Sequence, residues 1–215
     1  MTFERARSEK QKNERIEQIK VATLKEYENK GYHNISLSSI AKELNFTRAN
    51  LYRYISSKED IFLKIIIDEV NLWIDDLEKR TMTVSVNAIH TFSKEWVNSL
   101  LSNKRHLELL SLLSTVIEQN ATLDNLITFK NQLANSNKRL VNIIKIKFPC
   151  LSEEDIFKFL TYYVAMATGL NPICHPTKKQ IKAMHSSDYP TVIPEFKDMI
   201  LNFLKDTLSR FLNQK

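Results

Sequence analysis

The sequence predicts an all-helical protein, and three observations carry this prediction. Only two glycines, Gly31 and Gly169, and five prolines occur in 215 residues, so tight hairpins and glycine-rich phosphate loops have few residues to form from. Apolar residues recur at three- and four-residue spacing along most of the chain, as helices with one buried face require. Hydrophobic residues make up 43% of the chain, enough to bury a substantial core in one large or two small domains.

The first expected helix covers residues 8–30 and ends at a glycine. Apolar residues fall on one of its faces and charged residues on the others. Gly31 follows, and a glycine in the left-handed conformation is the usual residue just past a helix end. A second, short helix begins at Ser36, whose hydroxyl can cap the free amides of LSSIAKEL.

A tight turn separates the second helix from a third. Asn45 and Phe46 form this turn, because asparagine is among the few residues other than glycine that tolerate positive φ. Thr47 can cap a third helix that reaches about Tyr54. Two short helices joined by a tight turn make the helix-turn-helix pattern.

A long buried helix and a helical bundle are expected after this pattern. Ser56 or Ser57 caps a helix over residues 58–78, because Glu59 and Asp60 follow at the spacing of a capping box. Beyond it, apolar periodicity predicts helices over about 84–102, 104–118, 122–148, 152–170 and 193–213. The expected breaks fall near Asn103, Asn120, Pro149 and the stretch GLNPICHPT.

The formal net charge of +6 is concentrated in the region of the first helices. Residues 1–58 hold 12 Lys and Arg against 7 Asp and Glu, whereas residues 59–215 hold 19 against 18. Basic groups attract phosphate whatever its sequence, so this excess fits a polyanion partner. A slightly basic surface without such a partner would explain the same numbers.

The residues after the turn, TRANLYRY, combine basic, amide and aromatic side chains. In a helix-turn-helix protein the second helix enters the major groove, where arginine can pair with guanine and asparagine with adenine. Side chains one turn later suit phosphate or thymine-methyl contacts, and a lysine at the start of the next helix suits a phosphate. The predicted DNA contacts are Ser36, Thr47, Arg48, Ala49, Asn50, Tyr52, Arg53 and Lys58.

Four neighbouring residues are assigned either to the core of the helix-turn-helix module or to contact with DNA. Leu51 and Ile55, four residues apart, should face the core, and Tyr54 should pack there too. Tyr52 is expected to contact DNA. The alternative is core packing, because an aromatic at helical spacing is more often buried than exposed.

Residues 9–70 resemble the DNA-binding domain of the tetracycline-repressor (TetR) family of bacterial regulators. The resemblance rests on IKVATLKEYENKGY, ISLSSIAKEL and NFTRANLYRYISSKEDIF, in that order. Asn45 replaces the usual glycine of the turn and Ile55 the usual phenylalanine, and both substitutes suit their positions. The resemblance implies that residues 71–215 form a helical domain that dimerises and binds a small molecule.

The resemblance also implies that two helices of each subunit form a four-helix dimer interface, for which the candidates are 152–170 and 193–213. A two-fold DNA site needs two recognition helices about 34 Å apart, which one copy of the chain cannot supply. The alternative is that Phe196, Phe203 and Phe211 only seal the core of one subunit.

Large or polar side chains on otherwise apolar helices are candidates to line a cavity for an apolar or aromatic molecule. The candidate residues are Phe92, Trp96, His106, Tyr162, Tyr163 and Met166. Each could instead be ordinary core packing, and His106, between Lys104 and Arg105, could lie on the surface. Asn171-Pro172 should break a helix abruptly, either beside the ligand chamber or simply as a terminator.

Catalytic, metal-binding and membrane functions find no support. The five histidines show no i, i+4 pair, and neither HExxH nor CxxC occurs, so we expect no metal, no cofactor and no enzymatic activity. Cys174 and His175 are adjacent, but the sequence identifies no third group to orient a nucleophile. The N-terminus lacks a signal-peptide core and no apolar run approaches about 20 residues, so we expect a cytoplasmic protein.

The expected function is a homodimeric, ligand-responsive repressor that binds a palindromic operator in double-stranded DNA. A small molecule in the C-terminal domain would release it from the operator. A rival reading is an all-helical enzyme or carrier for an apolar molecule, with another role for the basic N-terminal module. A second rival keeps DNA binding but makes the protein an activator or a nucleoid-associated factor.

Overall fold

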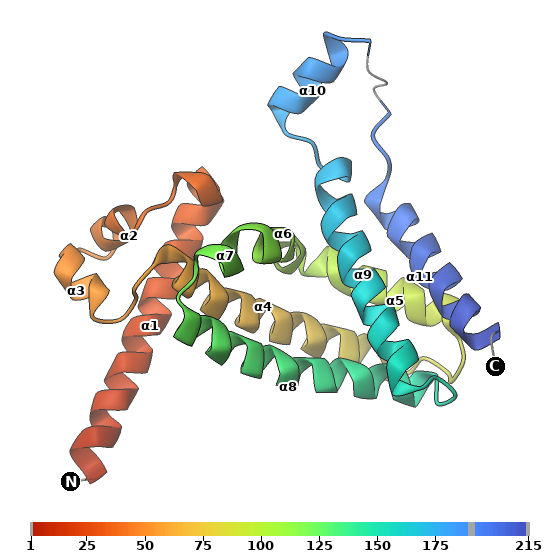
Figure 1. The fold of residues 1–215 in the computed structure, drawn as a ribbon, viewed down its shortest axis with the longest axis horizontal. Helices are drawn as coiled ribbons and strands as arrows, with labels where there is room; N and C mark the ends of the chain where they lie inside the picture. Colours follow the sequence, from red (N-terminus) through yellow and green to blue (C-terminus); the bar gives the residue numbers. More distant parts are fainter. Residues whose placement is uncertain (1, 189–191, 214–215) are drawn as a thin grey trace. The chain divides into compact units, whose positions relative to one another are not determined.

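The computed structural model describes residues 2–188 and 192–213, and these are mostly helical, without a strand among them (Figure 1). Residues 189–191 and 214–215 of the expected second domain lie outside the described residues. The chain forms two compact units. The first runs to Asp68 and adds Ser114–Gln132; the second comprises Glu69–Leu113 and the residues from Leu133 onward.

The first unit begins with α1 (Thr2–Lys30), a 3-10 turn (Tyr32–Asn34), α2 (Leu37–Glu43) and α3 (Arg48–Tyr52). Local polar groups set several of these boundaries as the sequence predicts, but α1 begins at Thr2 rather than at residue 8. Gly31 has φ 71° and its N–H donates to the carbonyl of Tyr27 at 2.8 Å, which closes α1. Asn45 adopts φ 55° in the turn, which confirms its expected conformation.

Helix α4 (Lys58–Thr81) runs from the first unit into the second. Ser57 rather than Ser56 caps it: its hydroxyl accepts from the N–H of Asp60 at 3.0 Å, and the Asp60 carboxylate accepts from the N–H of Ser57 at 3.1 Å. The same carboxylate accepts from the N–H and the hydroxyl of Thr122, at 2.9 and 3.0 Å. Asp60 therefore fastens the turn before α8 (Leu123–Lys147) to the start of α4.

The second unit contains the later part of α4 together with helices from the rest of the chain. These are α5 (Ile89–Ser102), α6 (Lys104–Leu112), the later part of α8, α9 (Glu153–Cys174), α10 (Lys178–His185) and α11 (Phe196–Asn213). Helix α11 packs along both α5 and α9, and α6 packs on α9 (Figure 1). Among the described residues, no helix is long and apolar enough to cross a membrane.

Several predicted helices start or end elsewhere: α4 ends at Thr81 rather than at 78, and α11 begins at Phe196 rather than at 193. The helix expected from residue 84 begins at Ile89, because Asn87 has φ 59° and its N–H donates to the carbonyl of Lys147 at 2.8 Å. The break expected at Asn171-Pro172 is wrong, since α9 continues to Cys174. Pro172 lies in the last turn, where its missing N–H removes one helical bond, and the N–H of His175 closes the helix on Asn171 at 3.0 Å.

Two further elements differ from the expected bundle. The helix expected over 104–118 is interrupted: α6 ends at Leu112, a π-helical turn covers Leu113–Ile117, and α7 (Glu118–Asn120) follows. Helix α10 was not expected at all. Its signal is local, since Thr177 caps it by accepting from the N–H of Gln180 at 3.3 Å, while the Gln180 side chain accepts from the N–H of Thr177 at 2.8 Å.

Candidate nucleic-acid interface and buried polar core

The recognition segment, residues 47–54, is anchored on its inner side by three apolar side chains. Ile40 from α2, Leu51 from α3 and Ile55 after α3 are between 0 and 3% exposed. This confirms the core positions expected for Leu51 and Ile55. Because they anchor one side of α3, the opposite side is left facing solvent.

The solvent side of α3 carries most of the predicted contacts. Arg48, Ala49, Tyr52 and Arg53 are exposed, and Asn50 is half-buried. The guanidinium of Arg48 lies 6.0 Å from the ring centroid of Tyr52, so the two side chains lie together on this surface. Helix α3 ends at Tyr52, two residues earlier than expected, and Arg53 forms its C-cap.

The hydroxyls of Ser36 and Thr47 hold the first turns of α2 and α3. Ser36 Oγ accepts from the N–H of Ser39 at 3.1 Å, and Thr47 Oγ1 accepts from the N–H of Asn50 at 3.2 Å. Both caps are exposed. The predicted caps are therefore confirmed, and each places a helix N-terminus, with its partial positive charge, at the surface.

Lys58 makes contacts inside the unit that the sequence did not reveal. Its ammonium donates to the carbonyls of Tyr32 and Ile35, both at 3.2 Å, and lies 4.3 Å from the ring centroid of Tyr32. The Tyr32 hydroxyl donates to Glu59 at 2.7 Å, and burial together with this carboxylate raises the pKa of the phenol. Lys58 thus ties the start of α4 to the segment before α2, and its contact with DNA stays a prediction.

A groove of about 640 Å³ lies beside the recognition segment, and its far wall was not anticipated from the sequence. Arg53 and Tyr54 form one wall. The other wall is the outer part of α1, with the polar residues Gln11, Lys12, Glu14, Arg15 and Gln18. Three cationic side chains and one carboxylate therefore line the groove.

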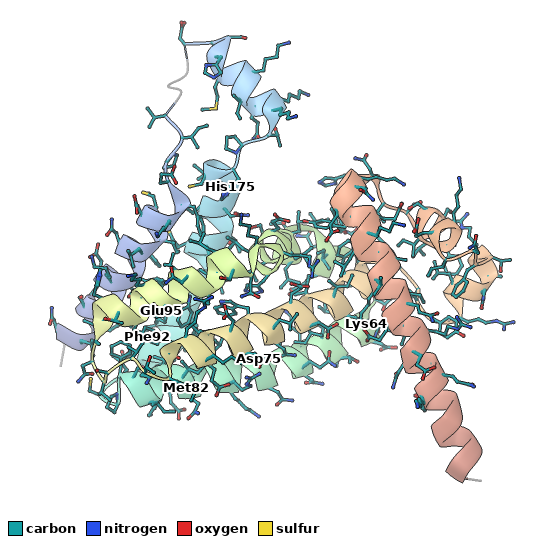
Figure 2. The ribbon with its side chains drawn as sticks, turned by 180° about the vertical axis from the view of Figure 1, so that it is seen from behind. Lys64, Asp75, Met82, Phe92, Glu95 and His175 are labelled. Carbon is teal, nitrogen blue, oxygen red and sulfur yellow. The ribbon has the colours of Figure 1, made fainter. Side chains whose placement is uncertain are left out.

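In the second unit, aromatic side chains from four helices form one buried cluster. Trp73 of α4 stacks on His106 of α6, with ring centroids 4.7 Å apart and an interplanar angle of 8°. Trp96 of α5 meets Trp73 edge to face at 5.5 Å, and Tyr163 of α9 meets Trp96 in the same way at 5.1 Å. Phe92, one turn before Trp96 on α5, packs against Trp96 with ring centroids 5.6 Å apart. Figure 2 labels Phe92 on this helix.

Several buried polar atoms of this cluster, and one on the neighbouring Ser93, lack hydrogen-bond partners within the part of the chain that the structure describes. They are Ser93 Oγ, Trp96 Nε1, both ring nitrogens of His106 and the Tyr163 hydroxyl. By contrast, Trp73 Nε1 donates to Ser99 Oγ at 2.9 Å. Burial lowers the pKa of His106 to about 4, so the ring is neutral near pH 7. Burial also raises the pKa of the Tyr163 phenol, which the Trp96 indole opposes to a smaller extent.

The candidate ligand residues thus separate into two groups. Phe92, Trp96, His106 and Tyr163 come together, and the alternative that His106 lies on the surface is wrong, since it is 3% exposed. Tyr162 does not join them: it is 48% exposed and stacks on Phe211, with centroids 6.3 Å apart. Met166 is half-buried. Trp73 and Ser93 were missed: Ser93 lies one helical turn before Trp96 on α5, whereas Trp73 is on α4, whose described residues supply no other member of the cluster.

The outer face of α9 is apolar and solvent-exposed. Phe157 and Val164, two turns apart on one face, are 70 and 41% exposed, and between residues 157 and 173 Lys158 is the one charged residue of the sequence. On α11, Phe196 and Phe211 are 4 and 8% exposed, which agrees with the alternative that they seal the core of one subunit, whereas Phe203 is half-buried. Among the described residues, no group of His, Cys, Asp and Glu is arranged to hold a metal ion.

Two short capped helices across a tight turn, with arginines on the exposed side and a separate helical domain following, define a helix-turn-helix regulator. Residues 19–65 match the tetR family of bacterial regulatory proteins, and residues 68–209 match the tetracyclin repressor-like C-terminal domain. The chain therefore belongs to the TetR family and is a DNA-binding transcriptional regulator.

Two solved structures have the same fold. A transcriptional regulator of the TetR/AcrR family from Thermobifida fusca is 18% identical with a TM-score of 0.50, and the match covers 91% of this chain and 96% of that one. The fatty acid degradation regulator FadR from Bacillus halodurans is 15% identical with a TM-score of 0.56, over 88% and 94% of the two chains. A search of curated proteins gives no match.

Proposed function

We propose that the chain acts in the cytoplasm as a homodimeric repressor that binds a palindromic operator and releases it when a small molecule binds the second unit. The observation that carries the DNA-binding half is the exposed first turn of α3. Arg48, Ala49 and Asn50 are presented there by the Thr47 cap and the buried Leu51. Arg48 would pair with guanine and Asn50 with adenine, each pair discriminating by about 1–3 kcal/mol.

The groove between α1 and the end of α3 extends this surface. Lys12, Arg15 and Arg53 line it against one acid, Glu14. Such a groove suits a backbone phosphate beside the bases that α3 reads, and phosphate contacts fix the register of a protein on DNA without specifying sequence. Ser36 and Lys58 would add phosphate contacts, Lys58 through the N–H that its two carbonyl partners leave available.

A dimer would supply the second recognition helix, and the outer face of α9 supports the proposal. An exposed apolar stripe is the usual mark of a surface that another protein covers. Phe157→Glu should convert the dimer into a monomer, as measured by light scattering after gel filtration. Val86→Glu is the matched control, because Val86 is 55% exposed in the same unit but outside α9. A dimer that survives Phe157→Glu would place the interface elsewhere.

Coupling between effector and DNA would run through α4. This helix carries Trp73 of the aromatic cluster and begins at Lys58 and Asp60, which fix the segment before α2 and the turn before α8. A ligand that shifts α4 would alter the spacing of the two recognition helices in the dimer. By linkage, operator DNA must then weaken effector binding by the same factor.

The test is selection of bound fragments from random duplex DNA by the purified protein, followed by the salt dependence of binding to the winner. A palindromic motif with half-sites about one helical turn apart supports the proposal. Phosphate contacts make the affinity fall steeply with salt. If the folded protein enriches no DNA fragment, the proposed operator binding is contradicted. The rival reading, a carrier or enzyme for an apolar molecule, is then favoured.

A further inference from the structure

The unpaired atoms of the aromatic cluster define what could bind there. The indole N–H of Trp96 can only donate, the hydroxyls of Ser93 and Tyr163 can donate or accept, and neutral His106 offers one donor and one acceptor. Each lacks a partner at full hydrogen-bond geometry among the described residues, although the Trp96 indole lies near enough to the Tyr163 hydroxyl to oppose the rise in the pKa of that phenol. Proteins rarely leave such groups unsatisfied, and four of the five atoms belong to rings of one cluster, which indicates a site whose partner is a separate molecule.

The rings around these atoms restrict the shape of that molecule. The Trp73 ring lies nearly parallel to the His106 ring, at an interplanar angle of 8°, and to the Tyr163 ring, at 18°. Phe92 and Phe159 close the cluster against Trp96, with centroids 5.6 and 5.5 Å from it. A flat molecule can take a place in such a stack once one ring moves aside, whereas a bulky one would also have to reorient the remaining rings.

Charge restricts the ligand as well. His106 is held neutral by its burial, and the ion pair next to it, Arg105 with Glu69 at 2.8 Å, is internally balanced. A carboxylate or an ammonium group would therefore enter without a counter-ion and would lose its hydration. The donor-only indole of Trp96 requires a hydrogen-bond acceptor instead.

We infer that Ser93, Trp96, His106 and Tyr163 form a recognition site for a neutral, flat aromatic molecule that carries a hydrogen-bond acceptor, such as an aryl amide or ketone. This rests on the proposed function, in which the second unit receives the effector. The ligand enters by opening the aromatic packing, because Trp96 and Tyr163 are 0 and 2% exposed. Trp96 donates to the acceptor, and Tyr163 and His106 complete its hydrogen bonding.

The two tryptophans of the chain provide an internal control for the test. Both lie in the cluster, and they give two indole N–H signals in a proton–nitrogen correlation spectrum of the full chain. The Trp73 indole already donates to Ser99, whereas the Trp96 indole has no partner among the described residues. Titration with benzamide should move the Trp96 indole proton downfield by more than that of Trp73.

Five probes of similar size separate the contributions of charge and of the hydrogen-bond acceptor. Benzamide and acetophenone should both bind and move the Trp96 signal. Ethylbenzene has no acceptor, benzoate carries a negative charge and benzamidine a positive one, and each should bind at least about fivefold more weakly, the effect of one lost hydrogen bond or more. Equal binding of ethylbenzene and benzamide, or preference for benzoate or benzamidine, overturns the inference, as does a Trp96 signal that no probe moves.

The Tyr163→Phe variant separates a role of the hydroxyl in ligand binding from a role in the stability of the fold. It removes a buried hydroxyl that has no partner, so the variant should unfold at the same or a higher temperature and yet bind benzamide about fivefold more weakly. A lower unfolding temperature, or unchanged benzamide affinity, would show that the hydroxyl is satisfied internally and would overturn its role. Trp73 signals and helicity confirm that the variant is folded.

DNA binding is measured separately, so that the two proposals fail in different ways. If benzamide moves the Trp96 signal while the affinity for the selected DNA fragment is unchanged, the site stands and the ligand-released repressor does not. If another compound releases DNA without moving Trp96, the repressor stands and this site does not.

Discussion

Two buried titratable side chains, one in each unit, differ in how completely they are hydrogen-bonded. Asp60 is 0% exposed, and its carboxylate accepts from the N–H of Ser57 and from the N–H and hydroxyl of Thr122. His106 is 3% exposed, and neither ring nitrogen has a partner among the described residues. Polar burial in the first unit therefore fixes the start of α4, whereas in the second unit it leaves groups available to bind a further molecule.

The largest effect is expected from Asp60→Ala. The substitution leaves two N–H groups and a hydroxyl without their acceptor, and it should lower the free energy of unfolding by about 4 kcal/mol. Urea unfolding measures this loss. Asp155→Ala is the matched control, because Asp155 completes a capping box at the exposed start of α9 and its removal should cost about 1 kcal/mol. Equal losses in both variants would contradict the special role of Asp60.

His106 should make the second unit sensitive to acid. The unfolded chain binds a proton at this residue near pH 6.5, but the folded chain only near a pKa of about 4, so the free energy of unfolding falls as the pH drops from about 6.5 to 4. The fall should reach about 3 kcal/mol near pH 4. Urea unfolding of the wild type and of His106→Gln across this range isolates it, since other groups titrate in both proteins. Parallel curves would mean that the buried ring has a partner after all.

Base recognition should depend on two residues of α3. Arg48→Ala and Asn50→Ala each remove one predicted base contact, and each should cost about 2 kcal/mol on the selected operator while changing non-specific DNA binding little. Fluorescence anisotropy with the operator and with an unrelated duplex measures both affinities. An equal loss on the two duplexes would assign these side chains to phosphate instead.

The sequence predicted those features that depend on neighbours within a few residues. Gly31, Asn45 and the caps at Ser36 and Thr47 lie where local backbone geometry and hydrogen bonding placed them. Each of these needs only a residue with the right conformational range or a side-chain oxygen three positions away. The helix-turn-helix part of the fold could therefore be predicted from the sequence.

Features that depend on residues far away in the sequence could not be predicted from it. Lys58 carries a charge suited to phosphate, but its contacts with Tyr32 and Ile35 depend on how α4 meets the preceding turn. Tyr162 and Tyr163 are adjacent in sequence, yet a rotation of about 100° per residue turns one outward and the other into the cluster. His106 follows two basic residues in the sequence and is nevertheless buried against Trp73, which only the packing of α6 decides.

The smallest effect is expected from substitutions in the groove beside α3, which should contact phosphate rather than bases. Arg15→Ala removes one of its three cations, and should weaken binding to all duplexes alike and reduce the slope of log affinity against log salt by about 0.9. Lys158→Ala is the control, because it removes one charge from α9 in the second unit and should leave the slope unchanged. Lys58→Ala should reduce the slope and also destabilise the fold, since its ammonium has two carbonyl partners. A slope that Arg15→Ala leaves intact would confine the DNA contacts to α2, α3 and the start of α4.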